Sequence, residues 1–167
     1  MVSAAVLSIG SNVGDRLGYL RGCVVMLGDA VRAASPVYET APWGDVVQDE
    51  FLNAVLLVED PHADAAEWLR RGQRCEAAAA RAREIRWGPR TLDVDVIDVD
   101  QTHRDDPGLT LPHPRAHQRA FVLVPWLDVQ PGAVLPGCGA VAALVAALPE
   151  AERRGVRRRA DLTLGWP

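Results

Sequence analysis

Apolar and acidic residues alternate between positions 92 and 96. Leu92, Val94 and Val96 occupy the even positions, and Asp93 and Asp95 occupy the odd ones. Because successive side chains of a β-strand point to opposite faces, this alternation predicts a strand with one face toward a core. The two aspartates then share the other face, with their side chains about 7 Å apart along the strand.

Apolar runs predict three further strands. Residues 2–9 are almost wholly apolar and are bounded by Gly10-Ser11-Asn12, as expected of a central strand covered on both faces. Residues 34–40 and 51–59 predict the next two strands. Asn53 is the odd residue of the last one, because a buried amide needs a polar partner, either a neighbouring backbone group or a ligand.

Residues 14–31 predict an amphipathic helix. Their apolar positions recur at three- and four-residue steps, in the stripe Leu17, Leu20, Val24, Leu27 and Val31. Asn12 or Asp15 is the expected cap. The glycine-bearing turn before the helix has two interpretations: a capping turn, or a cradle of backbone N–H groups for phosphate.

A second helix is expected to begin within residues 60–64, where Pro61 suits a first turn, and to run to about Arg83. Its predicted stripe becomes polar toward the C-terminal end, where we expect it to meet a ligand: Ala66, Leu69, Gln73, Glu76 and Ala80. Residues 121–127, which contain Pro125, predict a short or kinked helix, and residues 141–148 a final one. The polar segment 41–50 is a candidate lid, and Gly88-Pro89 separates the second helix from the strand of the two acids.

The order of these elements is strand, helix, strand, strand, helix, strand. This βαββαβ pattern predicts an α+β fold with a ferredoxin-like sheet, helices packed on one face and a short helical C-terminal extension. A length of 167 residues fits a single domain, 1–167. Within it, residues 150–167 form a basic tail that we expect to be solvated or frayed.

Composition narrows the class of protein. The net charge of −4 argues against a general nucleic-acid binder, and all 18 basic residues are arginine, which excludes a Walker-type lysine loop and a Schiff-base lysine. The 3 cysteines are widely scattered, which favours reduced thiols over a disulfide framework. Without a signal peptide or an apolar run long enough to cross a membrane, we expect a soluble, cytoplasmic monomer whose partners are small molecules rather than nucleic acid or membrane.

The acid pair and its neighbours indicate phosphate chemistry. Carboxylate oxygens suit Mg²⁺, which completes its shell with water and substrate phosphates. Arg81, Arg83, Arg86 and Arg90 surround Trp87-Gly88-Pro89, and a guanidinium can hold two phosphate oxygens at once. Together they favour phosphoryl or pyrophosphoryl transfer. The alternative is an ordinary surface strand with solvated acids beside a salt-bridged loop.

Five blocks carry a resemblance to a known family: LSIGSNVGDR, SPVYETAPWG, FLNAVLLVE, RWGPRTLDVDVIDV and LTLPHPRAHQRAFVLVPW. In this order they make the chain, from about Val6 to Val129, similar to the 6-hydroxymethyl-7,8-dihydropterin pyrophosphokinases of folate synthesis. The resemblance implies that ATP is a co-substrate, that two Mg²⁺ ions are bound, and that pyrophosphate passes to the hydroxymethyl group of the pterin with release of AMP.

The resemblance also implies a role for individual residues. The catalytic ones are Arg81, Arg90, Asp93 and Asp95, and the last two are also the metal ligands. The ATP-binding ones are Gln73, Glu76, Arg83, Trp87, Arg90, Ile97, Thr110, His113 and Arg119. The pterin-binding ones are Thr40, Pro42, Trp43, Phe51, Asn53, Trp87 and Phe121, of which Trp87 and Phe121 would enclose the ring from its two faces.

Two other functions are compatible with parts of the pattern. A different two-metal nucleotidyl- or phosphotransferase would keep Asp93 and Asp95 but would not need a pterin pocket. A non-catalytic ferredoxin-like regulatory module would bind ligand without forming AMP, and would tolerate removal of both acids.

Overall fold

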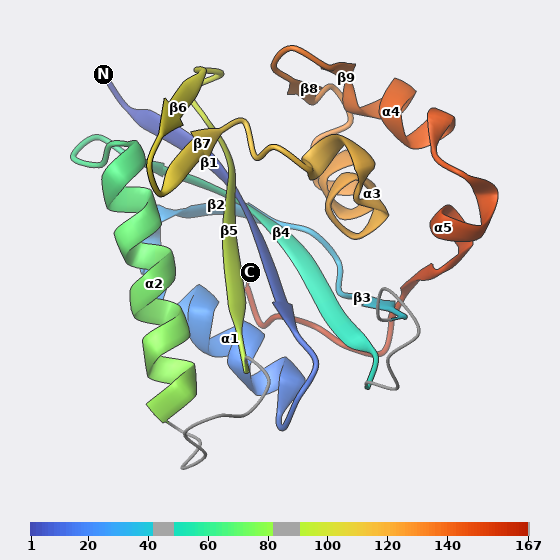
Figure 1. The fold of residues 1–167 in the computed structure, drawn as a ribbon. Coiled ribbons are helices and arrows are strands. Elements are labelled where there is room, and N and C mark those ends of the chain that lie inside the picture. Colours follow the sequence, from blue (N-terminus) through green and yellow to red (C-terminus); the bar gives the residue numbers. More distant parts are fainter. Residues whose placement is uncertain (42–48, 82–90, 167) are drawn as a thin grey trace.

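The computed structural model describes residues 1–41, 49–81 and 91–166, which form a mixed α/β structure built on an antiparallel sheet (Figure 1). The strands run in the order β10-β3-β4-β1-β5, and β2 also pairs with β4. Their bounds are Ser3–Ser11 for β1, Val31–Ala34 for β2, Tyr38–Thr40 for β3, Phe51–Asp60 for β4, Asp93–Val99 for β5 and Val156–Arg158 for β10. As its apolar sequence predicts, β1 is internal, between β4 and β5, and every residue of it except Ala4 is buried.

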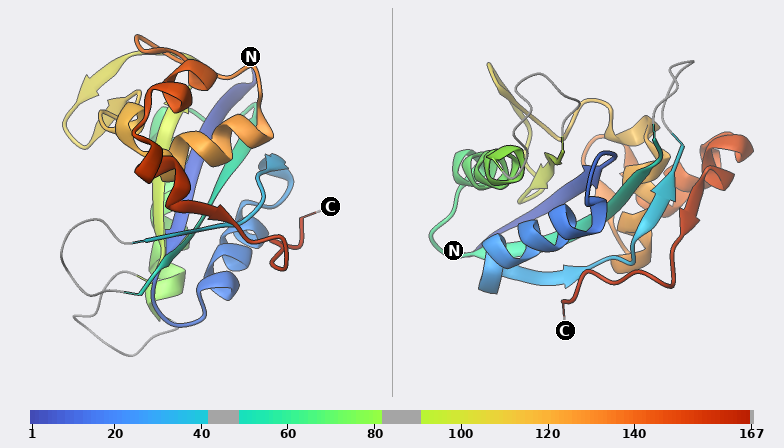
Figure 2. Two further views of the ribbon diagram at one scale, coloured as in Figure 1. Left: turned by 90° about the vertical axis from the view of Figure 1, so that its right-hand side faces the viewer. Right: turned by 90° about the horizontal axis from the view of Figure 1, so that it is seen from below.

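Helices cover both faces of the sheet (Figure 2). On one face lie α1 (Arg16–Leu27), which Asp15 caps and a 3₁₀ turn at Gly28–Ala30 follows, and α2 (Ala65–Arg81). On the other lies α3 (Ala120–Val129), preceded by a 3₁₀ turn at Ala116–Gln118 and followed by α4 (Val141–Ala147) and α5 (Glu150–Arg154). The expectation that helices pack on one face is therefore wrong.

Two apolar cores explain this arrangement. Leu7, Ile9 and Leu56 face α1 and α2, whereas Val6 and Val55 belong to a second core with α3 and α4. Strands with apolar residues on both faces need a cover on each, and the C-terminal helices supply the second one. As predicted, α3 contains Pro125 and α4 begins at Val141.

Two small hairpins complete the described elements. They are formed by β6 (Arg104–Asp106) with β7 (Leu109–Leu111), and by β8 (Val134–Leu135) with β9 (Gly139–Ala140). Within the described residues, no helix has the length and apolar character required to cross a bilayer.

The segment predicted as one strand, residues 34–40, is instead divided between β2 and β3, which both pair with β4. Ser35 and Pro36 lie at the break. Pro36 has no N–H to donate to a ladder, and the Ser35 hydroxyl accepts a hydrogen bond from the Val55 N–H at 2.9 Å. A side-chain hydroxyl thus takes the place of a backbone acceptor between the two strands.

The second helix begins later than predicted and buries a different stripe. Asp64 caps α2 by accepting a hydrogen bond from the Glu67 N–H at 2.7 Å, so Pro61 lies in the preceding turn. The buried positions are Ala65, Trp68, Gly72, Cys75 and Ala79, whereas Gln73 and Ala80 of the predicted stripe are exposed. The indole of Trp68 is fully buried. It is the largest apolar side chain of the helix, so its burial contributes most to the packing of α2.

The C-terminal tail is part of the sheet, contrary to the expectation of a frayed end. Residues 156–158 pair antiparallel with β3, and the Arg159 N–H donates a hydrogen bond to the Val37 carbonyl oxygen at 2.8 Å. The apolar Val156 at the head of the basic run packs against the second core. Backbone pairing, which depends little on side-chain type, therefore orders a sequence whose charges suggest a solvated end.

Three arginines on the first turns of α2 bind the carboxylate of Glu67. Arg70, Arg71 and Arg74 donate hydrogen bonds to its carboxylate at 3.0, 3.0 and 2.9 Å. These hydrogen bonds, that from Arg71 foremost, lower the pKa of Glu67 to about 2. The cluster stabilises the fold only while this carboxylate is ionised.

Replacing Glu67 by glutamine should flatten the acid limb of the stability curve. A carboxyl with a lowered folded-state pKa stabilises the protein above its ordinary pKa of 4.5, and this contribution disappears as the pH falls toward about 2. The free energy of unfolding of the parent should therefore fall more steeply than that of Glu67→Gln across this window. Urea denaturation at a series of pH values measures it, with the exposed Asp29→Asn as control; equal slopes for parent and Glu67→Gln would contradict the assignment.

Candidate functional site

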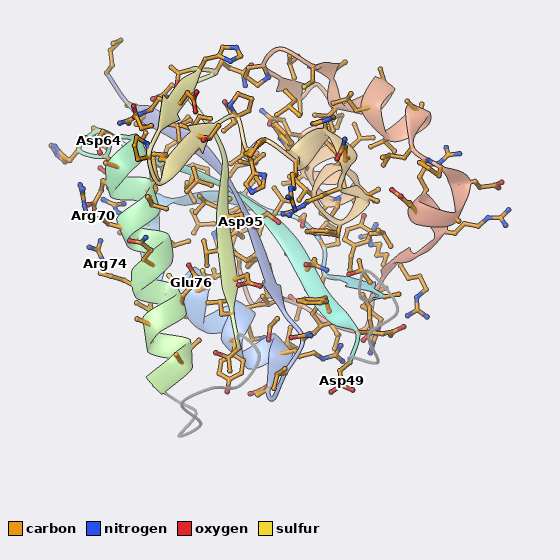
Figure 3. The ribbon with its side chains drawn as sticks, in the orientation of Figure 1. Asp49, Asp64, Arg70, Arg74, Glu76 and Asp95 are labelled. Atoms are coloured by element: carbon orange, nitrogen blue, oxygen red, sulfur yellow. The ribbon has the colours of Figure 1, made fainter. Side chains whose placement is uncertain are left out.

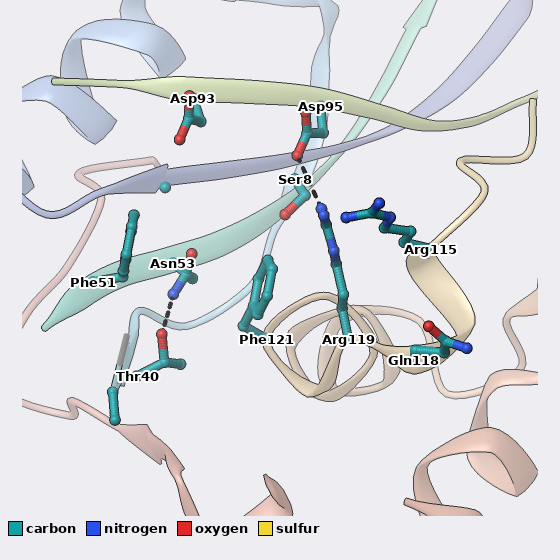
Figure 4. Close-up of a pocket in the computed structure, with 12 residues that line it drawn as sticks. Ser8, Thr40, Phe51, Asn53, Asp93, Asp95, Arg115, Gln118, Arg119 and Phe121 are labelled. Atoms are coloured by element: carbon teal, nitrogen blue, oxygen red, sulfur yellow. Dashed lines mark hydrogen bonds and ion pairs between the residues drawn. The ribbon is translucent and has the colours of Figure 1, made fainter. Parts of the chain in front are cut away.

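A cavity of about 420 Å³ opens on the sheet face that α3 partly covers (Figure 4). Four neighbouring strands, β3, β4, β1 and β5, line it together with the segment leading into α3 and the first turn of that helix. The lining residues are Ser8, Gly10, Thr40, Ala41, Phe51, Asn53, Asp93, Asp95, Arg115, Gln118, Arg119 and Phe121. It brings together residues that are more than 110 positions apart in the chain.

The strands change character along this face. Val6 and Val55 pack under α3. Ser8 and Gly10 follow Val6 at two-residue steps, Asn53 precedes Val55 by two residues, and these three line the cavity. The face is therefore apolar where α3 covers it and polar or glycine-bearing where the cavity opens. Strand alternation keeps these side chains on one side of the sheet.

The two aspartates project into the cavity from β5, as predicted (Figure 4). Asp93 lies opposite Gly10 and Asp95 lies opposite Ser8 in the ladder with β1. Both acids are partly exposed, and Arg119 approaches Asp95 with 3.7 Å between Nη1 and Oδ2. Small side chains on the neighbouring strand leave room beside the carboxylates for a ligand.

Two arginines lie on the opposite wall, and His113, which does not itself line the cavity, lies two residues before the first of them. The guanidinium of Arg119 stands over the Phe121 ring at 5.5 Å, and the guanidinium of Arg115 is directed toward the same region (Figure 4). The Arg115 N–H donates to Nδ1 of His113 at 3.2 Å, so the proton of the neutral ring is on Nε2. Burial lowers the pKa of His113 and outweighs the opposing effect of Asp95. His113 is therefore a neutral hydrogen-bonding group at pH 7.

A second part of the cavity is neutral. The buried Asn53 amide donates to the Thr40 hydroxyl oxygen at 2.7 Å, and Phe51 lies beside it. The need of Asn53 for a polar partner is confirmed, but the partner is a side chain of the neighbouring strand, which neither sequence-based alternative named. A Cβ at Gly10 would lie 2.7 Å from the amide oxygen of Asn53, so only glycine lets this amide lie where it does.

Several residues singled out from the sequence lie elsewhere. Gln73 and Glu76 are on α2 and do not line the cavity, Gln73 being exposed. The side chain of Ile97 is buried in the second core, and its carbonyl oxygen accepts the His113 N–H at 2.8 Å. Thr110 lines a separate hollow between the β6–β7 hairpin and the β8–β9 hairpin.

Other predicted site residues lie outside the part of the chain that the structure describes. These are Pro42, Trp43, the side chain of Arg81, Arg83, Arg86, Trp87 and Arg90. The glycine-bearing turn after β1 borders a different hollow, with Asn12, Arg16 and Glu39.

Five residues of the cavity were not predicted: Ser8, Gly10, Ala41, Arg115 and Gln118. Ser8 and Gly10 carry a signal in the sequence, because they are small or polar residues of like parity within an otherwise apolar strand. Arg115 and Gln118 carry none. They reach the cavity because the 3₁₀ turn at Ala116–Gln118 folds back toward β5.

The carboxylate pair fits a magnesium site of the open kind. Among the residues described, no group of three or more His, Cys, Asp and Glu could hold a metal ion. Mg²⁺ is commonly bound through one or two carboxylates together with substrate phosphates and water. Asp93 and Asp95 offer two such carboxylates beside an arginine-lined space for an anion.

Comparison with known proteins places the chain in a family. Residues 6–131 match the model of the 7,8-dihydro-6-hydroxymethylpterin-pyrophosphokinases. The 2-amino-4-hydroxy-6-hydroxymethyldihydropteridine pyrophosphokinase of Mycobacterium tuberculosis is 51% identical over 168 residues, covering 93% of this chain and 89% of that protein. The enzyme of the same name from Bacillus subtilis is 37% identical over 133 residues, covering 77% and 79%.

Solved structures agree in fold. A Plasmodium falciparum HPPK-DHPS crystal structure superposes with a TM-score of 0.73 at 12% identity, covering 95% of this chain. The chain spans about half the length of that protein, 49%. Because residues 6–131 match the family model and a relative is 51% identical, the chain belongs to the 7,8-dihydro-6-hydroxymethylpterin-pyrophosphokinase family.

Proposed function

We propose that this chain transfers pyrophosphate from ATP to the hydroxymethyl oxygen of 6-hydroxymethyl-7,8-dihydropterin in folate biosynthesis, giving the pterin diphosphate and AMP. The observation that carries the proposal is the division of one cavity into two parts. One part joins the acids Asp93 and Asp95 to the cations Arg115 and Arg119, and the other is neutral and centred on Asn53. Membership of the family and the names of its relatives support the same reaction.

The acidic part suits the triphosphate of ATP. Asp93 and Asp95 would hold two Mg²⁺ ions, which neutralise charge on the polyphosphate. Arg119, now beside Asp95, and Arg115 would bind phosphate oxygens, since a guanidinium matches them in shape and charge. Neutral His113 would donate a hydrogen bond from Nε2 without adding charge. Catalysis of this kind rests on positioning and on stabilising charge in the transition state.

The neutral part suits a flat heterocycle with hydrogen-bonding edges. The amide of Asn53 can read one edge of the pterin, with its orientation set by the Thr40 hydroxyl. Phe51 and Phe121 present rings to the same space, and aromatic faces favour stacking. The reacting hydroxyl would then lie between this part and the acids.

Further contacts belong to the proposal. For the nucleotide they are Gln73, Glu76, Arg81, Arg83, Trp87, Arg90, Ile97 through its backbone, and Thr110; for the pterin they are Pro42, Trp43 and Trp87. We also propose that the chain is one domain, acts as a monomer in the cytoplasm, and has a variant of the ferredoxin-like sheet. The order β3-β4-β1-β5 with antiparallel neighbours supports the last point.

The products distinguish this function from its rivals. Incubation of the protein with ATP, Mg²⁺ and the pterin alcohol should release AMP in equal amount to pterin diphosphate. Release of ADP would indicate an ordinary kinase. Binding of both ligands without any product would indicate a regulatory module, and binding of ATP without the pterin another phosphotransferase.

Removal of one carboxylate charge should abolish most of the turnover. For Asp95→Asn or Asp93→Asn we expect kcat to fall about 100-fold or more, because charge stabilisation of the phosphates is lost. The dissociation constant of the pterin alone should stay near that of the parent. Steady-state kinetics and calorimetry measure both, with the exposed Asp29→Asn as control; turnover near the parental rate in both aspartate variants of the cavity would exclude the assignment.

Loss of the Arg115 guanidinium should weaken ATP binding. Arg115→Ala is expected to raise the KM for ATP about 10-fold, the effect of losing one charge-assisted hydrogen bond to phosphate. The KM for the pterin should change little. Arg154→Ala is the matched control, since Arg154 is exposed on α5 and pairs locally with Glu150. Equal KM values for ATP in Arg115→Ala and Arg154→Ala would show that Arg115 does not touch the nucleotide.

A methyl group at Gly10 should disturb the pterin and spare the nucleotide. In Gly10→Ala the new Cβ would displace the Asn53 amide, 2.7 Å away, so we expect the KM for the pterin to rise about 10-fold or more. The same change in an Asn53→Ala background should add little, because the clashing group is gone. Gly22→Ala on the open side of α1 is the control, with no neighbour within 4 Å. Additive effects of the two changes would contradict this explanation.

A further inference from the structure

Three arginines converge on one carboxylate of β3. Arg16 of α1 donates to Glu39 at 2.8 Å, Arg159 donates to it at 3.0 Å, and Arg157 of β10 approaches to 3.7 Å. The Glu39 side chain is only 12% exposed. Burial alone would raise the pKa of Glu39, but the hydrogen bonds from Arg16 and Arg159 outweigh it and lower the pKa. The acid is therefore ionised and multiply bonded at neutral pH.

The same arginines also hold the start of β4. Arg157 donates two hydrogen bonds to the Glu50 carboxylate, at 2.7 and 2.8 Å, and Arg16 donates to the Glu50 carbonyl oxygen at 2.7 Å. Glu39, Glu50, Arg16, Arg157 and Arg159 thus form one network, here called the Glu39 clamp. It joins the first helix, two neighbouring strands and the C-terminal segment.

The clamp lies next to the neutral part of the cavity without lining it. Glu39 and Glu50 immediately precede Thr40 and Phe51, which pair with each other across the β3–β4 ladder and both line the cavity. Because neighbouring side chains of a strand point to opposite faces, Glu39 is directed away from the cavity that Thr40 enters. Any influence of the clamp on a ligand must pass through the backbone of these strands.

The geometry points to a positioning role: the Glu39 clamp fixes β3 against β4 so that Thr40 orients the Asn53 amide for the pterin. This inference rests on the proposed function and adds to it a control of pterin affinity by the C-terminal segment. Arg157 and Arg159 lie beyond residue 131, where the match to the family model ends. Val156, in the same segment, pairs with Thr40 itself.

The clamp would act by stabilising β3, so its effect should be confined to the neutral part of the cavity. The short strand β3 has three residues, so its ladders with β4 and β10 contain few hydrogen bonds. Hydrogen bonds from Arg16 and Arg159 to the Glu39 side chain, which is only 12% exposed, add stability to such an element and limit its local opening. The strand of the acids, β5, pairs with β1 and packs against α2, and both β1 and β4 lie between it and β3.

Four variants test the clamp: Glu39→Gln, Arg159→Gln, Arg159→Lys and, as control, Arg154→Gln. Arg154 is in the same C-terminal segment, but its ion pair is local, with Glu150. We expect Glu39→Gln and Arg159→Gln to raise the KM for the pterin about 10-fold, which corresponds to an about tenfold weaker affinity. The KM for ATP and kcat should stay within about twofold of the parent. Arg159→Lys should recover much of the loss because it keeps the charge.

Hydrogen exchange gives a second readout that needs no turnover. In Glu39→Gln the amides of residues 38–40 and 51–53 should exchange about 10-fold faster, while those of residues 93–99 should not change. If the parent forms no AMP, the proposed function fails, and the clamp is then judged by exchange alone. Unchanged exchange at 38–40 and 51–53 would overturn the clamp, as would a parallel rise of both KM values that follows the loss in melting temperature.

Discussion

The antiparallel register of β1 between β4 and β5 is the constraint on which the site depends. Gly10 pairs with Asn53 on one side and with Asp93 on the other, and Ser8 pairs with Asp95. A slip of one residue would turn both acids into the core under α2, where an unpaired carboxylate is very costly. The same slip would bring Val94 and Val96 to the cavity. Burial of the apolar residues at alternate positions of β5 therefore keeps the two acids on the cavity face.

The cavity exists because the second cover of the sheet is incomplete. α3 packs on Val6 and Val55 and leaves Ser8, Gly10 and Asn53 beyond its end. A longer cover would bury polar side chains that have few partners, and a shorter one would expose the apolar ends of the strands. The boundary between apolar and polar positions on one face thus coincides with the edge of the helix layer.

Charge is distributed within the molecule rather than spread over one surface. An acidic net charge of −4 accompanies arginines that are used locally, around Glu67, around Glu39 and beside Asp95. The first two groups fasten α2 and the C-terminal segment, respectively. Arg115 and Arg119 share the cavity with the acid pair, so a ligand that brings its own negative charge can use both arginines.

The sequence alone determined the features that arise from neighbouring residues. Alternation at 92–96 was enough to place Asp93 and Asp95 on one face, and the apolar run at 2–9 was enough to make β1 internal. The oddity of Asn53 correctly predicted a polar partner, and Asp15 was correctly named as a possible cap of α1. Each of these follows from local geometry, which depends on a few consecutive side chains.

Tertiary structure decided what depends on distant segments. Arg115 enters the cavity because a 3₁₀ turn folds back over the sheet, and the basic tail is ordered because β3 offers it an open edge. The stripe of α2 was set by the pocket that receives Trp68, and helices on the second face followed from two-sided burial rather than from the order of the elements. Such features are contacts between residues far apart in the chain. Their formation depends on which surfaces meet once the sheet has formed, and a pattern of neighbouring residues does not predict which surfaces these are.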